Sequence, residues 1–147
     1  MSAYDPEHVK PSPSDWVARQ AETYEASGGT EATDMNGSPC LLLDYQGRSS
    51  GDWHRTVLIY GRDGDDYLVV ASKGGTPEPP AWYLNLSEQP DVRVQVKADC
   101  FNARARTATA EEKPELWRTM AEIWPAYDEY QGKTDREIPV VVLERRA

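Results

Sequence analysis

Alternating hydrophobic and polar residues dominate the middle of the chain and predict a series of β-strands. Between Pro39 and Ala110, apolar residues recur at every second position or in short unbroken runs, and turn-forming residues separate the runs. A last run, Ile138–Glu144, has an unbroken apolar centre that is typical of a strand covered on both faces. The expected strands are Cys40–Tyr45, Trp53–Tyr60, Tyr67–Ser72, Asp91–Lys97, Cys100–Thr109 and Ile138–Glu144.

The links between these strands are short, which favours antiparallel pairing. Arg62-Asp63-Gly64-Asp65 has the composition of a hairpin turn, and Ala98-Asp99 leaves room only for a tight reversal. A parallel crossover needs about a dozen residues or more. We therefore expect a small β-barrel, because closure removes exposed sheet edges and leaves a concave mouth for a ligand.

A helix is expected before the strands. Ser12 is a candidate N-cap, Pro13 fits the first helical position, and the helix would end at Gly28-Gly29. Its expected buried stripe consists of Trp16, Val17, Ala21 and Tyr24.

A second helix is expected after the fifth strand. Thr109–Glu112 has capping-box spacing, and Pro125 stops the helical pattern. The apolar residues at helical intervals are Leu116, Trp117, Met120, Ile123 and Trp124.

Composition and charge narrow the class of protein. The chain has 147 residues, 39% hydrophobic and 28% charged, with a mean hydropathy of −0.72, which suits one soluble domain over residues 12–147 after a disordered start at 1–11. A net charge of −9 argues against nucleic-acid and anionic-membrane partners, so an anionic ligand needs a local cationic pocket. Two cysteines and two histidines without ligand spacing predict no metal. No leader or membrane span is evident, so a cytoplasmic location is expected, with the inner membrane face as a peripheral alternative.

The most informative segment is Ala71-Ser72-Lys73-Gly74-Gly75. Two glycines let backbone N–H groups face a ligand, while the lysine and the hydroxyl add charge and hydrogen bonds, as in a phosphate cradle. The spacing is not that of a P-loop. Pro80 then favours a helix start at Trp82-Tyr83-Leu84-Asn85 that would point at the same anion.

Two other groups of residues could belong to the same site. Arg48, Ser50 and Arg55 flank a glycine-rich turn, where either anion binding or surface solubility would explain them. Trp124, Tyr127 and Tyr130 recur every three residues, which suits either core packing or a substrate wall.

Together these segments resemble the deazaflavin (coenzyme F420)-dependent nitroreductase and quinone-reductase family, small split β-barrel oxidoreductases of actinobacteria and their relatives. The most specific shared feature is the combination of ASKGG with AWYLNL. The resemblance covers Asp15–Glu31, Gly47–Arg55, Asp63–Leu86, Pro90–Val96 and Pro125–Glu144.

The resemblance implies an α+β or mainly β split barrel, with about six mostly antiparallel strands and two to four flanking helices. It implies that reduced F420 passes a hydride to a quinone, a nitroaromatic or an activated alkene. Tyr130, Tyr127 and Ser72 would be candidate proton donors, and Trp124, Tyr127 and Tyr130 the substrate wall. The implied cofactor contacts are Arg48, Ser50, Arg55, Ala71, Ser72, Lys73, Gly74, Gly75, Trp82, Tyr83 and Asn85.

Two other functions fit the same residues. A split-barrel oxidoreductase that uses FMN could place its single phosphate on Lys73 and the arginines. A carrier could hold deazaflavin or a hydrophobic ligand without turnover. The expected partner is a small organic molecule, and the expected assembly is a monomer or a homodimer.

Overall fold

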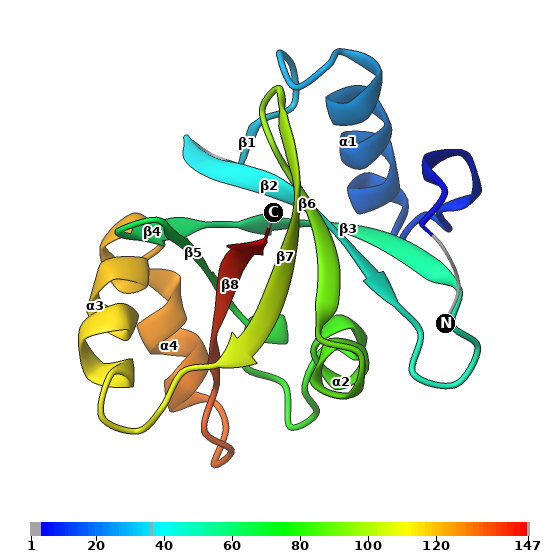
Figure 1. Cartoon of the computed structure of the whole chain (residues 1–147). Helices are drawn as coiled ribbons and strands as arrows, with labels where there is room; N and C mark the ends of the chain where they lie inside the picture. Colours follow the sequence, from blue (N-terminus) through cyan, green and yellow to red (C-terminus); the bar gives the residue numbers. More distant parts are fainter. Residues whose placement is uncertain (1–3, 36, 147) are drawn as a thin grey trace.

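One curled antiparallel sheet forms the centre of the computed structural model, which describes residues 4–35 and 37–146 (Figure 1). Within the described residues the sheet runs β1-β2-β6-β7-β8-β5-β4, and β3 pairs with β2. Only Tyr60 separates β3, which lies beside β2, from β4, which lies at the other end of this order. The chain therefore passes directly from one side of the sheet to the other at this point. The strands are β1 (Asp34–Met35), β2 (Ser38–Gln46), β3 (Trp53–Ile59), β4 (Gly61–Asp63), β5 (Asp66–Val70), β6 (Asp91–Val96), β7 (Asp99–Thr107) and β8 (Val140–Arg146).

The expected strands correspond to β2, β3, β5, β6, β7 and β8, with ends that differ by two residues or fewer. The expected hairpin turns are also present: Asp63 pairs with Asp66 across Gly64, which has φ 60°, and Val96 pairs with Asp99 across a turn in which Lys97 has φ 54°. The sequence pattern missed β1 and β4, because strands of two and three residues are too short to show alternation.

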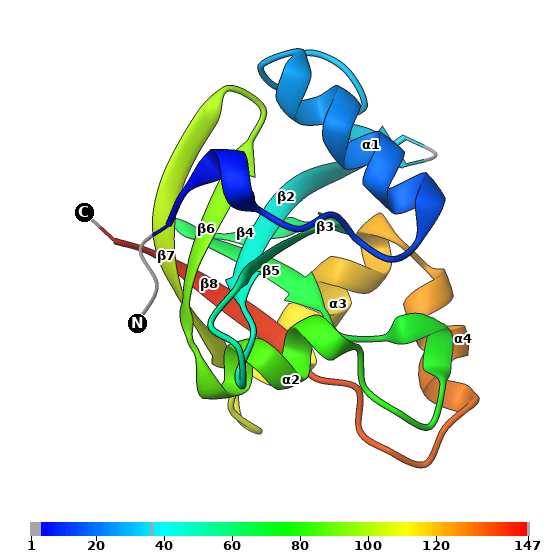
Figure 2. The same ribbon diagram turned by 90° about the vertical axis from the view of Figure 1, so that its right-hand side faces the viewer.

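Four helices cover the described part of the sheet in two groups. Helices α1 (Asp15–Ala26), α3 (Lys113–Ile123) and α4 (Ala126–Gly132) supply residues to one apolar cluster, together with inward residues of β2, β3, β5 and β8. Helix α2 (Ala81–Glu88) contributes Trp82 and Leu86 to a second cluster on the other face. Figure 2 shows α2 separated from α1 by the sheet. The expected number of flanking helices is therefore confirmed.

Helix α1 begins at Asp15, later than expected. Ser14 is its N-cap, and Ser12 accepts a hydrogen bond from the Ser14 N–H (3.2 Å) instead of capping the helix. Trp16 was expected in the buried stripe, but 53% of its surface is exposed. Successive helical residues are about 100° apart, so Trp16 points away from the stripe that contains Val17. The glycine stop is confirmed, since Gly29 has φ 84° and donates to the Tyr24 carbonyl (3.0 Å).

The capping box before α3 is confirmed by two reciprocal hydrogen bonds. The Thr109 N–H donates to Glu112 Oε2 (2.8 Å), and the Glu112 N–H donates to Thr109 Oγ1 (3.3 Å). The Thr109 carbonyl then accepts from the Lys113 N–H (3.0 Å), which starts the helical pattern.

The segment of residues 4–10, called the N-terminal strap below, lies against β3 and β2. Lys10 donates its N–H to the Trp53 carbonyl (2.8 Å) and accepts from the Arg55 N–H (2.9 Å), while the Tyr4 hydroxyl donates to Asp44 Oδ2 (2.6 Å). Disorder over residues 1–11 as a unit stays a prediction, and residues 1–3 lie outside the described residues. In the described ranges, no helix has the length and apolar character to cross a membrane.

Candidate functional site

The segment Ala71–Thr76, called the grip loop below, follows directly after β5 and has an unusual backbone. Ser72 is helical (φ −82°, ψ −40°), and Lys73, Gly74 and Gly75 then have positive φ values of 45°, 65° and 82°. The Gly75 N–H donates to the Ser72 carbonyl (2.9 Å), and the Thr76 N–H donates to the Lys73 carbonyl (3.3 Å). A helical residue followed by left-handed residues gathers successive N–H groups into a concave site for an anion.

The two glycines of this loop are required for different reasons. A Cβ added to Gly75 would lie 2.4 Å from the Tyr130 carbonyl oxygen, so this glycine allows the loop to pack on the backbone of α4. A Cβ added to Gly74 would meet nothing within 4 Å. The Gly74 side of the loop is therefore open to a ligand, while the Gly75 side is fixed to α4.

The grip loop and the aromatic residues of α4 line the same cavity, of about 410 Å³. The start of α2 and the N-terminal end of α1 contribute further walls. Most of the walls are apolar, as is usual for pockets that bind planar organic molecules. The cavity is lined by Trp16, Val17, Met35, Val57, Leu58, Ile59, Val70, Ser72, Lys73, Gly74, Pro80, Trp82, Trp124, Tyr127 and Tyr130.

A few polar groups remain available in this cavity. Lys73 is exposed and makes no ion pair or side-chain hydrogen bond to the residues that the structure describes. The hydroxyls of Ser72 and Tyr127 likewise have no hydrogen-bond partner among those residues. Because no fully buried polar side-chain atom in the described part of the chain lacks a partner, both hydroxyls must reach accessible space.

The two tyrosines of the cavity differ in their surroundings. Burial raises the pKa of Tyr127, so its hydroxyl stays protonated through neutral pH. The Tyr130 hydroxyl accepts a hydrogen bond from Trp124 Nε1 (3.4 Å), which leaves its own proton free to be donated. The rings of the two tyrosines meet edge to face at 6.1 Å between centroids.

The structure thus brings together most of the expected site. Ala71 is fully buried beside the cavity, and Gly75 forms the junction with α4. The expected site residues that line the cavity are Ser72, Lys73, Gly74, Trp82, Trp124, Tyr127 and Tyr130.

Other expected cofactor contacts lie outside this cavity. Arg48 donates through its N–H and Nη1 to Asn85 Oδ1 (3.0 and 2.9 Å), about one turn of α2 beyond Trp82. Ser50 stabilises its own turn, since its Oγ accepts from the Asp52 N–H (3.1 Å). Tyr83 turns toward a separate hollow, where its hydroxyl lies 2.8 Å from Thr107 Oγ1.

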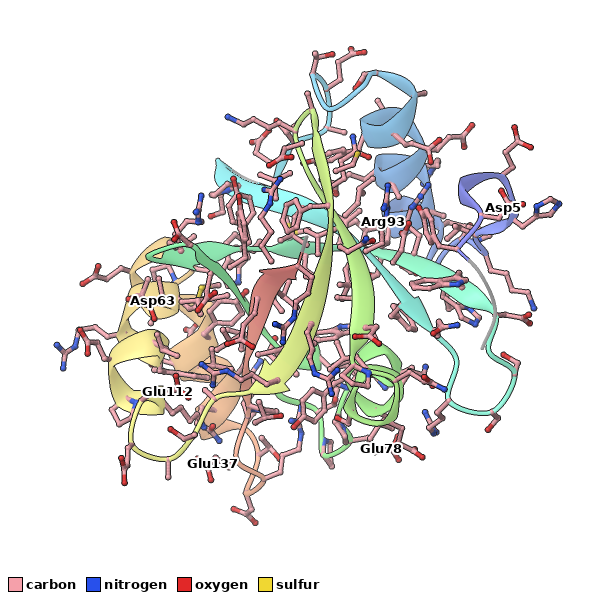
Figure 3. The ribbon with its side chains drawn as sticks, viewed as in Figure 1. Asp5, Asp63, Glu78, Arg93, Glu112 and Glu137 are labelled. Atoms are coloured by element: carbon pink, nitrogen blue, oxygen red, sulfur yellow. The ribbon has the colours of Figure 1, made fainter. Side chains whose placement is uncertain are left out.

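Arg55 is the expected cofactor contact whose surroundings fit that role least. Its Nε and Nη2 donate to the two oxygens of Asp44 (2.7 and 2.8 Å), and its Nη1 donates to Glu25. Asp44 is only 3% exposed and stands opposite Arg55 in the register of β2 and β3, so this carboxylate needs the cation. Arg93, labelled in Figure 3, stands opposite Asp44 in the register of β2 and β6, and its guanidinium lies 4.9 Å from the centre of the Tyr4 ring. A cofactor role for Arg55 stays a prediction, and these ion pairs count against it.

Trp16 and Arg136 are among the residues of the site that were not expected from the sequence. Trp16 lines the cavity because it points out of the buried stripe of α1. Arg136, in the link between α4 and β8, donates to the carbonyls of the grip loop. In the sequence, the only indication of this role is the positive charge of Arg136 shortly before the last strand.

Comparison with known proteins supports the same identification. The sequence model of the F420H(2)-dependent quinone reductase family matches residues 16–145. An F420H(2)-dependent quinone reductase of Mycobacterium tuberculosis is 40% identical over 127 residues, which cover 84% of this chain and 85% of that protein. A solved F420-H2-dependent reductase is 38% identical, with a TM-score of 0.68, over 72% of this chain and 94% of its own. A solved domain-swapped dimer is 37% identical, with a TM-score of 0.71, over 90% of this chain and 100% of its own.

These similarities extend from the sequence to the fold. The curled antiparallel sheet with its flanking helices is the split-barrel α+β fold of F420-dependent reductases, which confirms the expected fold class. The match includes both the grip loop and the aromatic residues of α4. The chain therefore belongs to the F420H(2)-dependent quinone reductase family.

Proposed function

We propose that this protein passes a hydride from reduced F420 to a quinone-type acceptor and that the cavity between the grip loop and α4 is where this occurs. The observation that carries the proposal is that one cavity joins the grip loop to an aromatic wall formed by Trp124, Tyr127 and Tyr130. A cofactor with an anionic tail and a flat organic acceptor need these two kinds of surface side by side. Nitroaromatics and activated alkenes are further candidate acceptors.

The residues present fit the cofactor that the family name implies. F420 carries a phosphate and an acidic tail, and the grip loop offers the unpaired Lys73 cation, concave N–H groups and an open side at Gly74. Trp82 and the apolar residues of β3 offer a dry surface for a ring. When bound, F420H2 supplies the hydride.

The protein's own residues would orient the two molecules and deliver a proton. Reducing a quinone to a hydroquinone takes one hydride and one proton, and a hydroxyl group beside the acceptor can donate that proton. Tyr127 and Tyr130 both line this cavity and carry a hydroxyl group, and Ser72 is the third candidate. Lys73 would hold the anionic tail, while Trp82 and Trp124 would exclude water from the reacting faces.

The proposal is tested by mixing the purified protein with F420H2 and menadione and following the absorbance of the oxidised deazaflavin. Oxidation well above the protein-free rate supports the proposal. Tight binding of FMN without any response to F420 would instead show an FMN enzyme. Binding of F420 with no turnover across quinone, nitroaromatic and activated-alkene acceptors would show a carrier.

The proton donor is tested separately with Tyr127→Phe. We expect the rate of acceptor reduction to fall by about 100-fold, a typical effect of losing a general acid, with unchanged affinity for F420. Tyr67→Phe is the matched control, because Tyr67 packs on Phe101 and Arg62 away from the cavity. An unchanged rate in Tyr127→Phe would move the assignment to Tyr130, for which Tyr130→Phe is the next variant.

The assembly is proposed to be a monomer or a homodimer. The similar domain-swapped dimer supports the homodimer. Light scattering coupled to size-exclusion chromatography distinguishes the two.

A further inference from the structure

Arg136 contacts the main chain of the grip loop at three points. Its Nη2 donates to the Ser72 carbonyl (2.8 Å), its Nε to the Thr76 carbonyl (2.9 Å) and its Nη1 to the Ala71 carbonyl (3.3 Å). These carbonyls flank Lys73, Gly74 and Gly75 on both sides. A planar guanidinium carries its N–H donors on three nitrogens in a rigid fork and so spans separated acceptors, whereas the three N–H donors of a lysine diverge from a single nitrogen.

These bonds hold the grip loop in a backbone conformation that is unfavourable for a free chain. Lys73 carries a Cβ and yet has φ 45°, and two more left-handed residues follow it. Such backbone persists only where the surrounding structure determines it. Arg136 bonds the carbonyls on both sides of the three left-handed residues. The other restraints on the loop hold its ends, through the bonds of Ala71 to Pro139 and of Thr76 to Glu78, or are the two local N–H to carbonyl bonds and the contact of Gly75 with Tyr130.

The Arg136 bonds also set the polarity of the loop. Carbonyls directed toward a guanidinium cannot direct their negative ends at a ligand, so the ligand side keeps N–H groups and the Lys73 ammonium. The guanidinium adds a fixed positive charge close to the loop. In a chain with a net charge of −9, this local charge favours an anionic ligand.

Arg136 is itself held by α4, the helix that carries Tyr127 and Tyr130 of the aromatic wall. Gln131 Nε2 donates to the Arg136 carbonyl (2.8 Å), and Gln131 Oε1 accepts from the Ile138 N–H (2.9 Å). Gln131 directly follows Tyr130, whose backbone contacts Gly75. The loop and the aromatic wall therefore share one set of restraints.

We propose that Arg136 is a positioning residue for the cofactor. Its three bonds to the Ala71, Ser72 and Thr76 carbonyls hold the grip loop in its anion-binding conformation and fix the position of the loop against α4. This inference rests on the proposed binding of F420 at the grip loop. Arg136 acts through the loop and has no contact of its own with the reacting atoms.

The test compares Arg136→Ala with Arg136→Lys and with Arg118→Ala. Arg118 is an exposed residue of α3 with no hydrogen bond or ion pair to the described residues, so its removal gives the same change in net charge. The first measurement is hydrogen exchange of the peptide over residues 71–77 without any cofactor. We expect exchange to become about 10-fold faster in Arg136→Ala and to stay unchanged in Arg118→Ala.

The second measurement is the affinity for F420 from quenching of its fluorescence, together with steady-state kinetics. We expect Arg136→Ala to raise the Kd and the KM for F420H2 by about 10- to 100-fold, with kcat at saturation and the KM for menadione nearly unchanged. Arg136→Lys keeps the positive charge and loses the planar guanidinium, so its Kd and KM for F420H2 should lie between those of the wild type and of Arg136→Ala. Millimolar methylguanidinium should restore part of the affinity of Arg136→Ala, which a general loss of stability would not allow.

The outcomes separate this inference from the proposed function. Normal exchange at residues 71–77 and an unchanged Kd in Arg136→Ala would overturn the positioning role while leaving F420 binding intact. If the wild-type protein did not bind F420, the proposed function would fail, and the exchange measurement would still decide whether Arg136 orders the loop. If Arg136→Ala failed to fold, Arg136→Lys would decide, and wild-type exchange and affinity in that variant would overturn the proposal.

Discussion

Replacing Gly75 with alanine provides a direct test of the junction between the grip loop and α4. The new Cβ would lie 2.4 Å from the Tyr130 carbonyl oxygen and 2.9 Å from its Cα, and both atoms belong to the backbone of a helix. An alanine at φ 82° adds a conformational cost of about 1–2 kcal/mol. The forced overlap adds about 1–3 kcal/mol, as in overpacked cores. We therefore expect Gly75→Ala to lower the free energy of unfolding by roughly 2–5 kcal/mol.

Gly74→Ala is the control for the conformational part of this cost. Gly74 also has a positive φ, but its Cβ would meet nothing within 4 Å, so only about 1–2 kcal/mol should be lost. In thermal unfolding, Gly75→Ala should melt roughly 3–10 °C below Gly74→Ala. Equal melting temperatures would refute the claim that the loop packs on α4. Gly74→Ala should nevertheless weaken F420 binding, because its methyl group would project from the open side of the loop.

Three further expectations follow from the charged residues. Lys73→Ala should weaken F420 binding by about 1–3 kcal/mol in fluorescence titrations without changing the melting temperature, and an unchanged affinity would remove Lys73 from the site. Arg55→Ala should lower the unfolding free energy in urea by about 3–5 kcal/mol, because it leaves the buried Asp44 carboxylate unpaired, and a purely cofactor-related defect would contradict this. The hydrogen bonds from Arg106 lower the pKa of Glu112 to about 2 from 4.5, so the stability that this pair contributes should be complete above pH 4.5 and be lost as the pH falls toward 2. Urea unfolding from pH 7 to 2 should show this loss in the wild type and not in Glu112→Gln.

Features set by local chemistry were predictable from the sequence. Alternation located the principal strands, Gly28-Gly29 stopped α1, and the spacing of Thr109 and Glu112 gave a capping box. The open backbone of the grip loop was predictable for the same reason, since the two glycines beside Lys73 allow consecutive positive φ values, while its binding of an anion stays a prediction. Each of these signals lies within a few residues of the structure that it determines.

Features set by long-range pairing were not predictable. The fate of Arg55 depends on the register of β2 against β3, which places the buried Asp44 opposite it. The hydrogen bonds of Arg136 join it to a loop that lies 60 to 65 positions earlier in the chain. Tyr83 and Trp82 are neighbours, and only the packing of α2 decides that Trp82 lines the cavity while Tyr83 faces another hollow. The residue type predicts whether a side chain is charged or aromatic, but its contact partners depend on the tertiary fold.

The N-terminal strap protects the protein against aggregation through an exposed strand edge. Among the described strands, β3 pairs with β2 alone, and the main chain of Lys10 covers part of the other edge of β3 through its bonds to Trp53 and Arg55. An uncovered strand edge is a template for addition of a strand from another molecule. A protein shortened to begin at residue 12 would expose this edge, and we expect it to aggregate more readily than the full chain.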